Sequence, residues 1–218
     1  MMENHLPVSN KLKASRNSLP DMIANHLLKK IFMGEFIQGE RLIESEIARE
    51  LNVSNIPVRE AFYILQNTEI IERLPRKGVR VKAMSKKEIN DYKDALIEVY
   101  QLGVDYSQHK WNEDNLRQLE DYLKEATEKL VEKDVLEYVL KCDQISHYIF
   151  VVANNKALLR FYSEIAYITK VYCQIKWEKD KIDYYHSRIE GMVKAIQAGD
   201  FEQAKTELVT LTNESLII

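Results

Sequence analysis

The chain has 218 residues, of which 45% are hydrophobic and 30% are charged, and its formal net charge is −3. This length provides one large domain or two small ones, each able to bury a core. No apolar run approaches the roughly 18 residues that a membrane span needs. The segment 1–18 is polar and lacks the apolar core of a signal peptide. We therefore expect a cytoplasmic protein without a membrane-spanning segment.

Charge and proline are distributed unevenly along the chain. Residues 1–84 hold 13 Lys and Arg against 10 Asp and Glu, a net charge of +3, whereas residues 85–218 hold 18 against 24, a net charge of −6. All 4 prolines lie within the first 75 residues, and proline breaks helix interiors. The composition predicts a flexible tail over 1–18, a basic first domain over 19–84 and an all-helical second domain over 85–218.

The first domain begins with a helix over about 20–33, whose apolar residues form one stripe. A second helix is expected over about 44–51 and a third over about 54–67. Asn52 lies in the turn between them, where a left-handed residue is needed and asparagine is tolerated. Ser54 is placed to cap the third helix. Two short helices joined by a tight turn predict a helix-turn-helix, whose second helix enters the DNA major groove.

Two short strands follow the third helix. The runs 70–74 and 79–82 alternate in polarity around the polar loop 75–78, and this arrangement predicts a β-hairpin. A hairpin directly after a helix-turn-helix is a wing. The first domain is therefore predicted to be a winged helix.

The second domain is predicted to be helical throughout. Six helices are expected, at about 85–109, 113–131, 134–152, 155–177, 183–198 and 200–217. Ser85 with Glu88 forms a capping box, Asp134 and Asp200 are placed to cap later helices, and Gly199 ends the fifth helix. Most of its many tyrosines are expected in the core or an interface, with a few lining a polar cavity. The predicted fold class is mostly α: an amino-terminal winged helix-turn-helix followed by an all-α bundle of about six helices.

A specific set of residues extends across the first domain. It consists of Gly34, Gly39, Glu40, Arg41, Leu42, Glu44, Glu46, Ile47, Ala48, Leu51, Val53, Ser54, Pro57, Val58, Arg59, Glu60, Ala61, Leu65, Pro75 and Gly78. The set fixes the spacing of helix, turn, helix and wing together. It closely resembles the GntR family of bacterial transcription regulators over about residues 19–84.

The helical remainder resembles the FCD effector domain of the FadR-like branch of that family. The resembling segments are 143–147, Asn154 with Asn155, and 195–200. This resemblance implies a homodimer that binds palindromic double-stranded operator DNA and whose DNA affinity changes when a small metabolite binds the helical domain. Repression relieved by the effector is the commonest scheme in such families, so a repressor is expected.

Arg59 is the leading candidate for base readout, because its guanidinium group can donate two hydrogen bonds to a guanine edge. The alternative is that Arg59 pairs only with Glu60 or with a phosphate. Ser54 can combine capping with a phosphate contact, and Asn55 and Ile56 lie at the same end of the helix. Family members usually carry arginine at the position of Asn55, so the operator is expected to depart from the usual half-site.

The predicted wing tip is compact and basic. Arg76 and Lys77 are placed to reach phosphates or the minor groove, and Gly78 allows a close backbone approach. A merely solvated turn is the alternative. Second-rank candidates for phosphate contact are Ser45, Arg41 and Arg49.

Asp143 and His147 are four residues apart and share one helical face. With His186 they are candidate ligands for Zn²⁺ or Ni²⁺, and the alternative is a hydrogen-bonded pair in a polar pocket. FCD proteins that hold metal usually carry two further histidines, and the resemblance places Ile189 and Leu211 at those positions. We therefore expect no certain cofactor.

The resemblance also implies what the effector domain binds. Leu96 and Tyr100 stand where the family often has an arginine and a glutamate, so charged positions have become apolar or aromatic. A pocket formed by Tyr100 with the three candidate ligands described above would suit a small polar effector. Two alternatives remain: a helical domain that only dimerises, and, more remotely, a metal-dependent hydrolase, although the chain lacks a complete ligand set and the common catalytic motifs.

Overall fold

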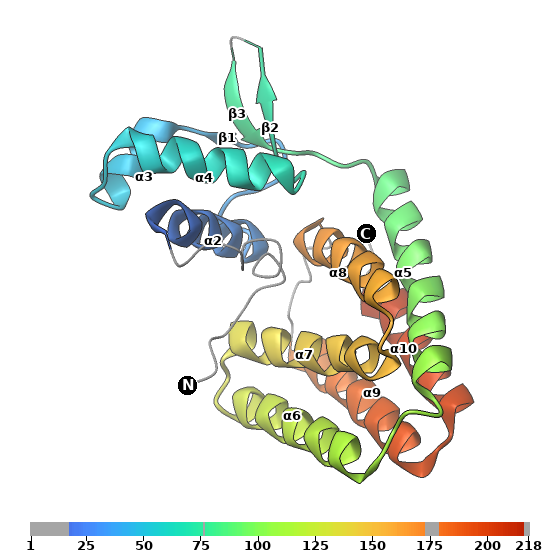
Figure 1. Cartoon of the computed structure of the whole chain (residues 1–218). Helices are drawn as coiled ribbons and strands as arrows, with labels where there is room; N and C mark the ends of the chain where they lie inside the picture. Colours follow the sequence, from blue (N-terminus) through green and yellow to red (C-terminus); the bar gives the residue numbers. More distant parts are fainter. Residues whose placement is uncertain (1–17, 76, 173–178, 216–218) are drawn as a thin grey trace. The chain divides into compact units, whose positions relative to one another are not determined.

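The computed structural model describes residues 18–75, 77–172 and 179–215 (Figure 1). Residues 1–17 of the expected tail, Arg76 of the wing tip and the end of the expected helix at 173–177 lie outside the described residues. The chain divides into two compact units whose main break falls between Glu88 and Ile89. The sequence placed this boundary near residue 84.

The first unit contains the helices α2 (Leu19–Phe32), α3 (Glu44–Glu50) and α4 (Asn55–Asn67). Ser18 and Asp21 form a reciprocal capping box that begins α2. Helices α2 and α4 pack together, and their facing apolar residues form the core. Its largest side chains, each at most 2% exposed, are Leu27, Leu28, Ile31, Phe62 and Leu65.

The turn between α3 and α4 confirms one expectation and corrects another. Asn52 has a φ of 52°, the left-handed conformation that the sequence predicted. Ser54 occupies the N-cap position of α4, but its side chain makes no capping hydrogen bond. The expectation that the Ser54 hydroxyl group caps the helix is therefore wrong, and this group remains exposed.

A three-stranded antiparallel sheet completes the first unit. The strands β1 (Arg41–Leu42), β2 (Ile71–Leu74) and β3 (Gly78–Val81) lie in the order β1-β3-β2. β2 and β3 form the expected hairpin, which projects from this unit in Figure 1. Sequence analysis did not find β1, because two residues are too short to show an alternating pattern.

The second unit is helical, as predicted. Its helices are α5 (Lys86–Ser107), α6 (Glu113–Val131), α7 (Val135–Ala153), α8 (Lys156–Tyr172), α9 (Lys179–Ala198) and α10 (Phe201–Ser215). The capping box of Ser85 with Glu88 is formed, and Asp134 and Asp200 accept the capping hydrogen bonds expected of them. Gly199 has a φ of 74° and ends α9.

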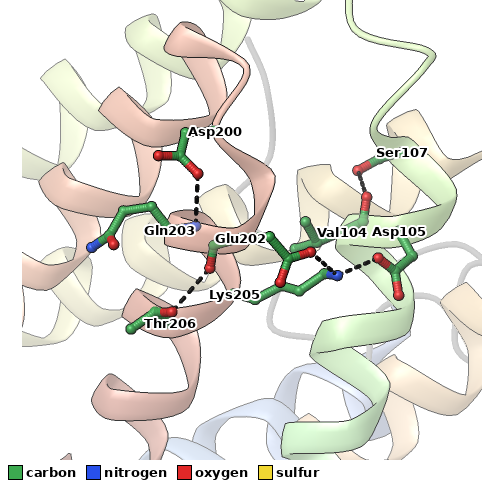
Figure 2. A network of polar contacts seen from close by, with 8 residues as sticks. All are labelled: Val104, Asp105, Ser107, Asp200, Glu202, Gln203, Lys205 and Thr206. Carbon is green, nitrogen blue, oxygen red and sulfur yellow. Dashed lines mark hydrogen bonds and ion pairs between the residues drawn. The ribbon is translucent and has the colours of Figure 1, made fainter.

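Ion pairs tie the helices of this unit together at the edge of its core. Figure 2 shows Lys205 of α10, whose Nζ lies 2.5 Å from Asp105 of α5 and 2.7 Å from Glu202 of α10. The Lys205 side chain is only 17% exposed, so its ammonium group is held between the two carboxylates. This ion pair links α10 to α5.

No helix in the described ranges combines the length and the apolar character that crossing a membrane requires.

Candidate functional site

The exposed face of α4 carries the strongest candidate site. The opposite face of the helix buries Val58, Ala61, Phe62 and Leu65, and helical geometry therefore turns the side chains at 56, 59 and 63 outward. The Ile56 side chain is 65% exposed and Arg59 is 54% exposed. Ser54 and Asn55 are also exposed at the beginning of the helix.

Arg59 forms a two-pronged ion pair with Glu44 of α3. Its Nε donates to Glu44 Oε2 at 3.1 Å, and its Nη2 donates to Glu44 Oε1 at 2.7 Å. Hydrogen bonding to Glu44 raises the pKa of the Arg59 guanidinium group. The alternative partner considered from the sequence was Glu60, and the structure assigns the pairing to Glu44 instead. Sequence analysis missed Glu44, because a pairing across 15 residues depends on how α3 crosses α4.

Other predicted contact residues are also exposed in the first unit. Ser45 and Arg49 are exposed on α3. Tyr63, which sequence reasoning did not select, is 52% exposed on α4, and Arg73 of β2 stacks on its ring at 5.3 Å. A position seven residues after Ile56 lies on the same helical face, and that spacing was the available signal.

The wing is braced from β1. Nη2 of Arg41 donates a hydrogen bond to the backbone carbonyl of Lys77, so Arg41 supports the wing tip from inside the same unit. Lys77 itself is exposed. Gly78 has a φ of 85°, and a Cβ added there would meet nothing within 4 Å. The backbone at Gly78 therefore has open space beside it, and a close approach to DNA at this residue stays a prediction.

In the helical unit, three of the four predicted effector residues gather around Tyr162. The Tyr162 hydroxyl donates to Asp143 Oδ1 at 3.2 Å. The rings of Tyr100 and His147 lie 5.5 Å and 6.3 Å from the Tyr162 ring. Phe150 stacks on the Tyr162 ring, with a centroid distance of 4.0 Å. We call these five residues the Tyr162 cluster.

The aromatic residues Tyr100, Phe150 and Tyr162 of the Tyr162 cluster are buried, whereas Asp143 and His147 are partly exposed. Tyr162 is 1% exposed and Tyr100 is 8% exposed. Burial raises the pKa of both phenols, and hydrogen bonding from Ser146 opposes part of this shift. Both hydroxyl groups therefore stay protonated and remain hydrogen-bond donors. Ser146 and Tyr162 were not singled out from the sequence, because neither has a distinctive spacing from Asp143.

His186, the fourth predicted residue, makes its contacts elsewhere. Its Nε2 lies 3.3 Å from Thr127 Oγ1 of α6, and its ring lies 5.8 Å from the ring of Tyr138. Burial lowers the pKa of His186, against the opposing charges of Glu190 and Asp183. Within the described residues, His186 Nδ1 is buried without a hydrogen-bond partner.

The predicted metal ligands do not form a set that fits a metal ion. Across residues 18–75, 77–172 and 179–215, no three His, Cys, Asp or Glu side chains lie close enough to hold one. Asp143 and His147 lie at the Tyr162 cluster, whereas His186 faces Thr127. Ile189 and Leu211, the positions of the missing histidines, are 0% and 5% exposed and belong to the apolar core.

Known proteins share both the fold and the amino-terminal sequence. The sequence model that describes the family of bacterial regulatory proteins called gntR matches residues 19–81 of this chain. An uncharacterised HTH-type transcriptional regulator of Bacillus subtilis, YdhC, is 33% identical over 107 residues, which cover 49% of this chain and 47% of that protein. The gluconate operon transcriptional repressor of Bacillus licheniformis is 39% identical over 80 residues, which cover 37% of this chain and 32% of the repressor.

The matched segments thus span about half, or less, of these two relatives. Solved structures cover more of the chain. Escherichia coli McbR superposes with a TM-score of 0.74 at 18% identity, over 91% of this chain and 95% of that one. A GntR transcriptional regulator from Rhodococcus gives 0.73 at 21% identity, over 89% and 94%.

These relatives are named as transcriptional regulators, not as enzymes. The two structural likenesses extend the shared fold through the helical unit. With its helix-turn-helix, its wing and its matching sequence, the domain at residues 19–81 belongs to the gntR family of bacterial regulatory proteins.

Proposed function

We propose that this protein is a DNA-binding transcription regulator that inserts α4 into the major groove of its operator. The proposal depends on the exposed face of α4, where the side chain of Arg59, with its charged guanidinium group, is 54% exposed to solvent. A bidentate contact from arginine to O6 and N7 of guanine is the commonest specific base contact. Ile56, which is 65% exposed, is suited to the methyl group of a neighbouring thymine.

Phosphate contacts complete the proposed interface. Because its hydroxyl group is not used as a cap, Ser54 has a donor available for a phosphate oxygen. Arg49, Ser45 and Lys77 are exposed and supply further contacts, while Asn55 is suited to an adenine edge. Arg41 acts chiefly by holding the wing tip in place.

The helical unit is proposed to bind a small polar effector at the Tyr162 cluster. The hydroxyl group of Tyr162 donates to the carboxyl group of Asp143, and the Tyr100 hydroxyl group interacts with Tyr162 and Ser146, so the cluster contains both donors and an acceptor. An effector that binds one conformation better shifts the protein toward it and changes DNA affinity. We propose repression as the sign of regulation, in line with the repressor named among the relatives.

We also propose a homodimer that binds a palindromic operator, because helix-turn-helix dimers read two half-sites about one helical turn apart. Leu102 and Tyr106, which are 45% and 50% exposed, lie four residues apart on α5 and form an apolar strip. Light scattering should give twice the chain mass, and the paired substitution of both residues by glutamate should give the single chain mass. A monomeric wild-type protein would contradict this part of the proposal.

The test of DNA recognition is in vitro selection of bound sequences, followed by affinity measurements on the enriched operator. We expect Arg59→Ala to lower operator affinity about tenfold or more. Arg117→Ala is the matched control, since Arg117 is 71% exposed on α6 in the helical unit. Operator affinity should also fall steeply with salt, because phosphate contacts release counterions. An Arg59→Ala variant with wild-type affinity would refute the proposal.

A helical unit that only dimerises is the competing function. Thermal unfolding against a panel of small polar metabolites separates the two, because a ligand that binds the native state raises the unfolding midpoint. A true effector should raise the midpoint of the wild type and should lose this effect in Asp143→Asn.

A further inference from the structure

The pairing of Arg59 with Glu44 has a defined geometry. Two parallel hydrogen bonds, of 3.1 Å and 2.7 Å, join the guanidinium group of α4 to the carboxylate of α3. The Glu44 side chain is 26% exposed, against 54% for Arg59. The carboxylate therefore lies at the base of the pair, and the guanidinium group faces solvent.

This geometry leaves a particular edge of Arg59 available. A guanidinium group has five N–H donors in a rigid fork. Within the described residues, Glu44 occupies the edge formed by Nε and Nη2, and the edge formed by Nη1 and Nη2 carries no recorded bond. That second edge also offers two parallel N–H groups, which is what O6 and N7 of a guanine require.

Held in this way, the arginine side chain loses little further rotamer freedom when a base binds. Arginine otherwise carries about 2 kcal/mol of rotamer entropy. The carboxylate also places a negative charge beside the guanidinium group, and this charge opposes a phosphate as the alternative ligand. Both effects favour a neutral base edge over a phosphate.

We propose that Glu44 is a positioning residue that makes Arg59 a reader of guanine instead of a general phosphate contact. The inference rests on the proposed DNA-binding function and concerns the origin of its base preference. Glu44 touches Arg59 and not the base, so its removal should reduce discrimination between sequences more than it reduces binding to DNA in general.

Glu46 provides a matched control for the charge. It lies in the same first turn of α3 as Glu44 and is exposed, and the structure records no ion pair for it within the described residues. Glu46→Gln and Glu44→Gln therefore remove the same charge from the same turn. Only Glu44→Gln removes the carboxylate that holds Arg59.

The experiment uses the full-length protein and the operator enriched with the wild type. Selection with Arg59→Ala first identifies the guanine whose preference is lost. That base is then replaced by 7-deazaguanine, which lacks the N7 acceptor, and dissociation constants are measured on the operator, on the modified operator and on unrelated DNA.

We expect the replacement to weaken binding about tenfold for the wild type and for Glu46→Gln. For Glu44→Gln, the replacement should weaken binding by less than about threefold. The affinity of both Glu44→Gln and Glu46→Gln for unrelated DNA should stay equal or increase, because each variant has lost a negative charge. In an Arg59→Lys background, where the fork is absent, Glu44→Gln should have no further effect on discrimination.

Two results would overturn the inference: full tenfold discrimination in Glu44→Gln, or a parallel loss of affinity for operator and unrelated DNA. The second would mean that Glu44 only stabilises the domain. If the wild type enriches no sequence at all, the DNA-binding proposal itself fails, so failure of the function and failure of the inference are distinguishable.

Discussion

The two units place their candidate site residues in opposite environments. On α4, Ile56 and Arg59 are more than half exposed, whereas Tyr100 and Tyr162 in the helical unit are 8% and 1% exposed. An exposed side chain can meet a large partner without disturbing the core, but an enclosed cluster is also part of the packing. Substitutions on the exposed face of α4 should therefore change DNA binding with little change in stability, and substitutions of the buried tyrosines should change stability.

The largest expected loss of stability is at Gly103 of α5. A Cβ added there would lie 2.6 Å from Cε1 of Phe150, which stacks on Tyr162. We expect Gly103→Val to lower the free energy of unfolding by about 1–3 kcal/mol through overpacking. This loss is larger than the stability gained because valine has a higher helix propensity than glycine. Urea unfolding measures this change.

Val151→Ala is the control, because Val151 follows Phe150 on α7 and is 44% exposed. Its free energy of unfolding should change by less than about 0.5 kcal/mol. If both variants were as stable as the wild type, the tight contact between α5 and Phe150 would be refuted.

Tyr162→Phe should have the next largest effect. It removes the hydroxyl group that donates to Asp143 at 3.2 Å in an enclosed site, and it should lower the free energy of unfolding by about 1 kcal/mol. Tyr63→Phe, at a position 52% exposed on α4, should change it far less. Equal effects of the two substitutions would mean that the hydrogen bond to Asp143 contributes nothing to stability.

Two serines of the first unit stand at the N-caps of helices, but only one of them forms a capping hydrogen bond. Ser18 caps α2 through its side chain, so Ser18→Ala should lower the free energy of unfolding by about 1 kcal/mol. Ser54 makes no such bond, so Ser54→Ala should leave stability nearly unchanged and weaken operator binding. A loss of stability in Ser54→Ala equal to that in Ser18→Ala would show that Ser54 caps α4 after all.

The smallest expected effect concerns pH. Burial lowers the pKa of His186 in the folded protein, so the unfolded chain binds the proton more readily. The stability associated with neutral His186 is present above the unfolded pKa of about 6.5 and is lost as the pH falls through it. The thermal midpoint should therefore decrease as the pH falls below about 6.5 toward the lower pKa of the folded state.

His186→Gln should make this decrease smaller, whereas the same substitution at His109, which is exposed on the surface, should not. If the two variants follow the wild-type pH profile equally, His186 does not contribute to the acid sensitivity.

Local patterns were sufficient for most of the fold. The helix at 113–131 was predicted with the bounds that α6 has, since its caps and apolar stripe are both local signals. The strand β1 was missed, because it is defined by its pairing with β3 and not by its own two residues. The prediction that Ser54 caps α4 through its side chain was wrong, because a suitable residue at the N-cap position does not determine where its hydroxyl group points.

Sequence analysis likewise selected some residues of each candidate site and missed others. Arg59 was selected as a candidate from its place on the third helix, but its partner Glu44 was not, since nothing in the spacing of 15 residues indicates contact. Asp143 and His147 were selected as candidates because they share one helical face. Tyr162, which joins them from α8, was not singled out, and His186, which was grouped with them, contacts Thr127 instead.

The sequence by itself determined the order of the helices, the winged helix-turn-helix and the outward face of α4, because periodicity, capping residues and turn residues act over a few positions. Tertiary structure alone decided which polar groups meet: Arg59 with Glu44, Tyr162 with Asp143, and Lys205 with Asp105. Each of these contacts joins different helices, and its distance depends on how those helices cross.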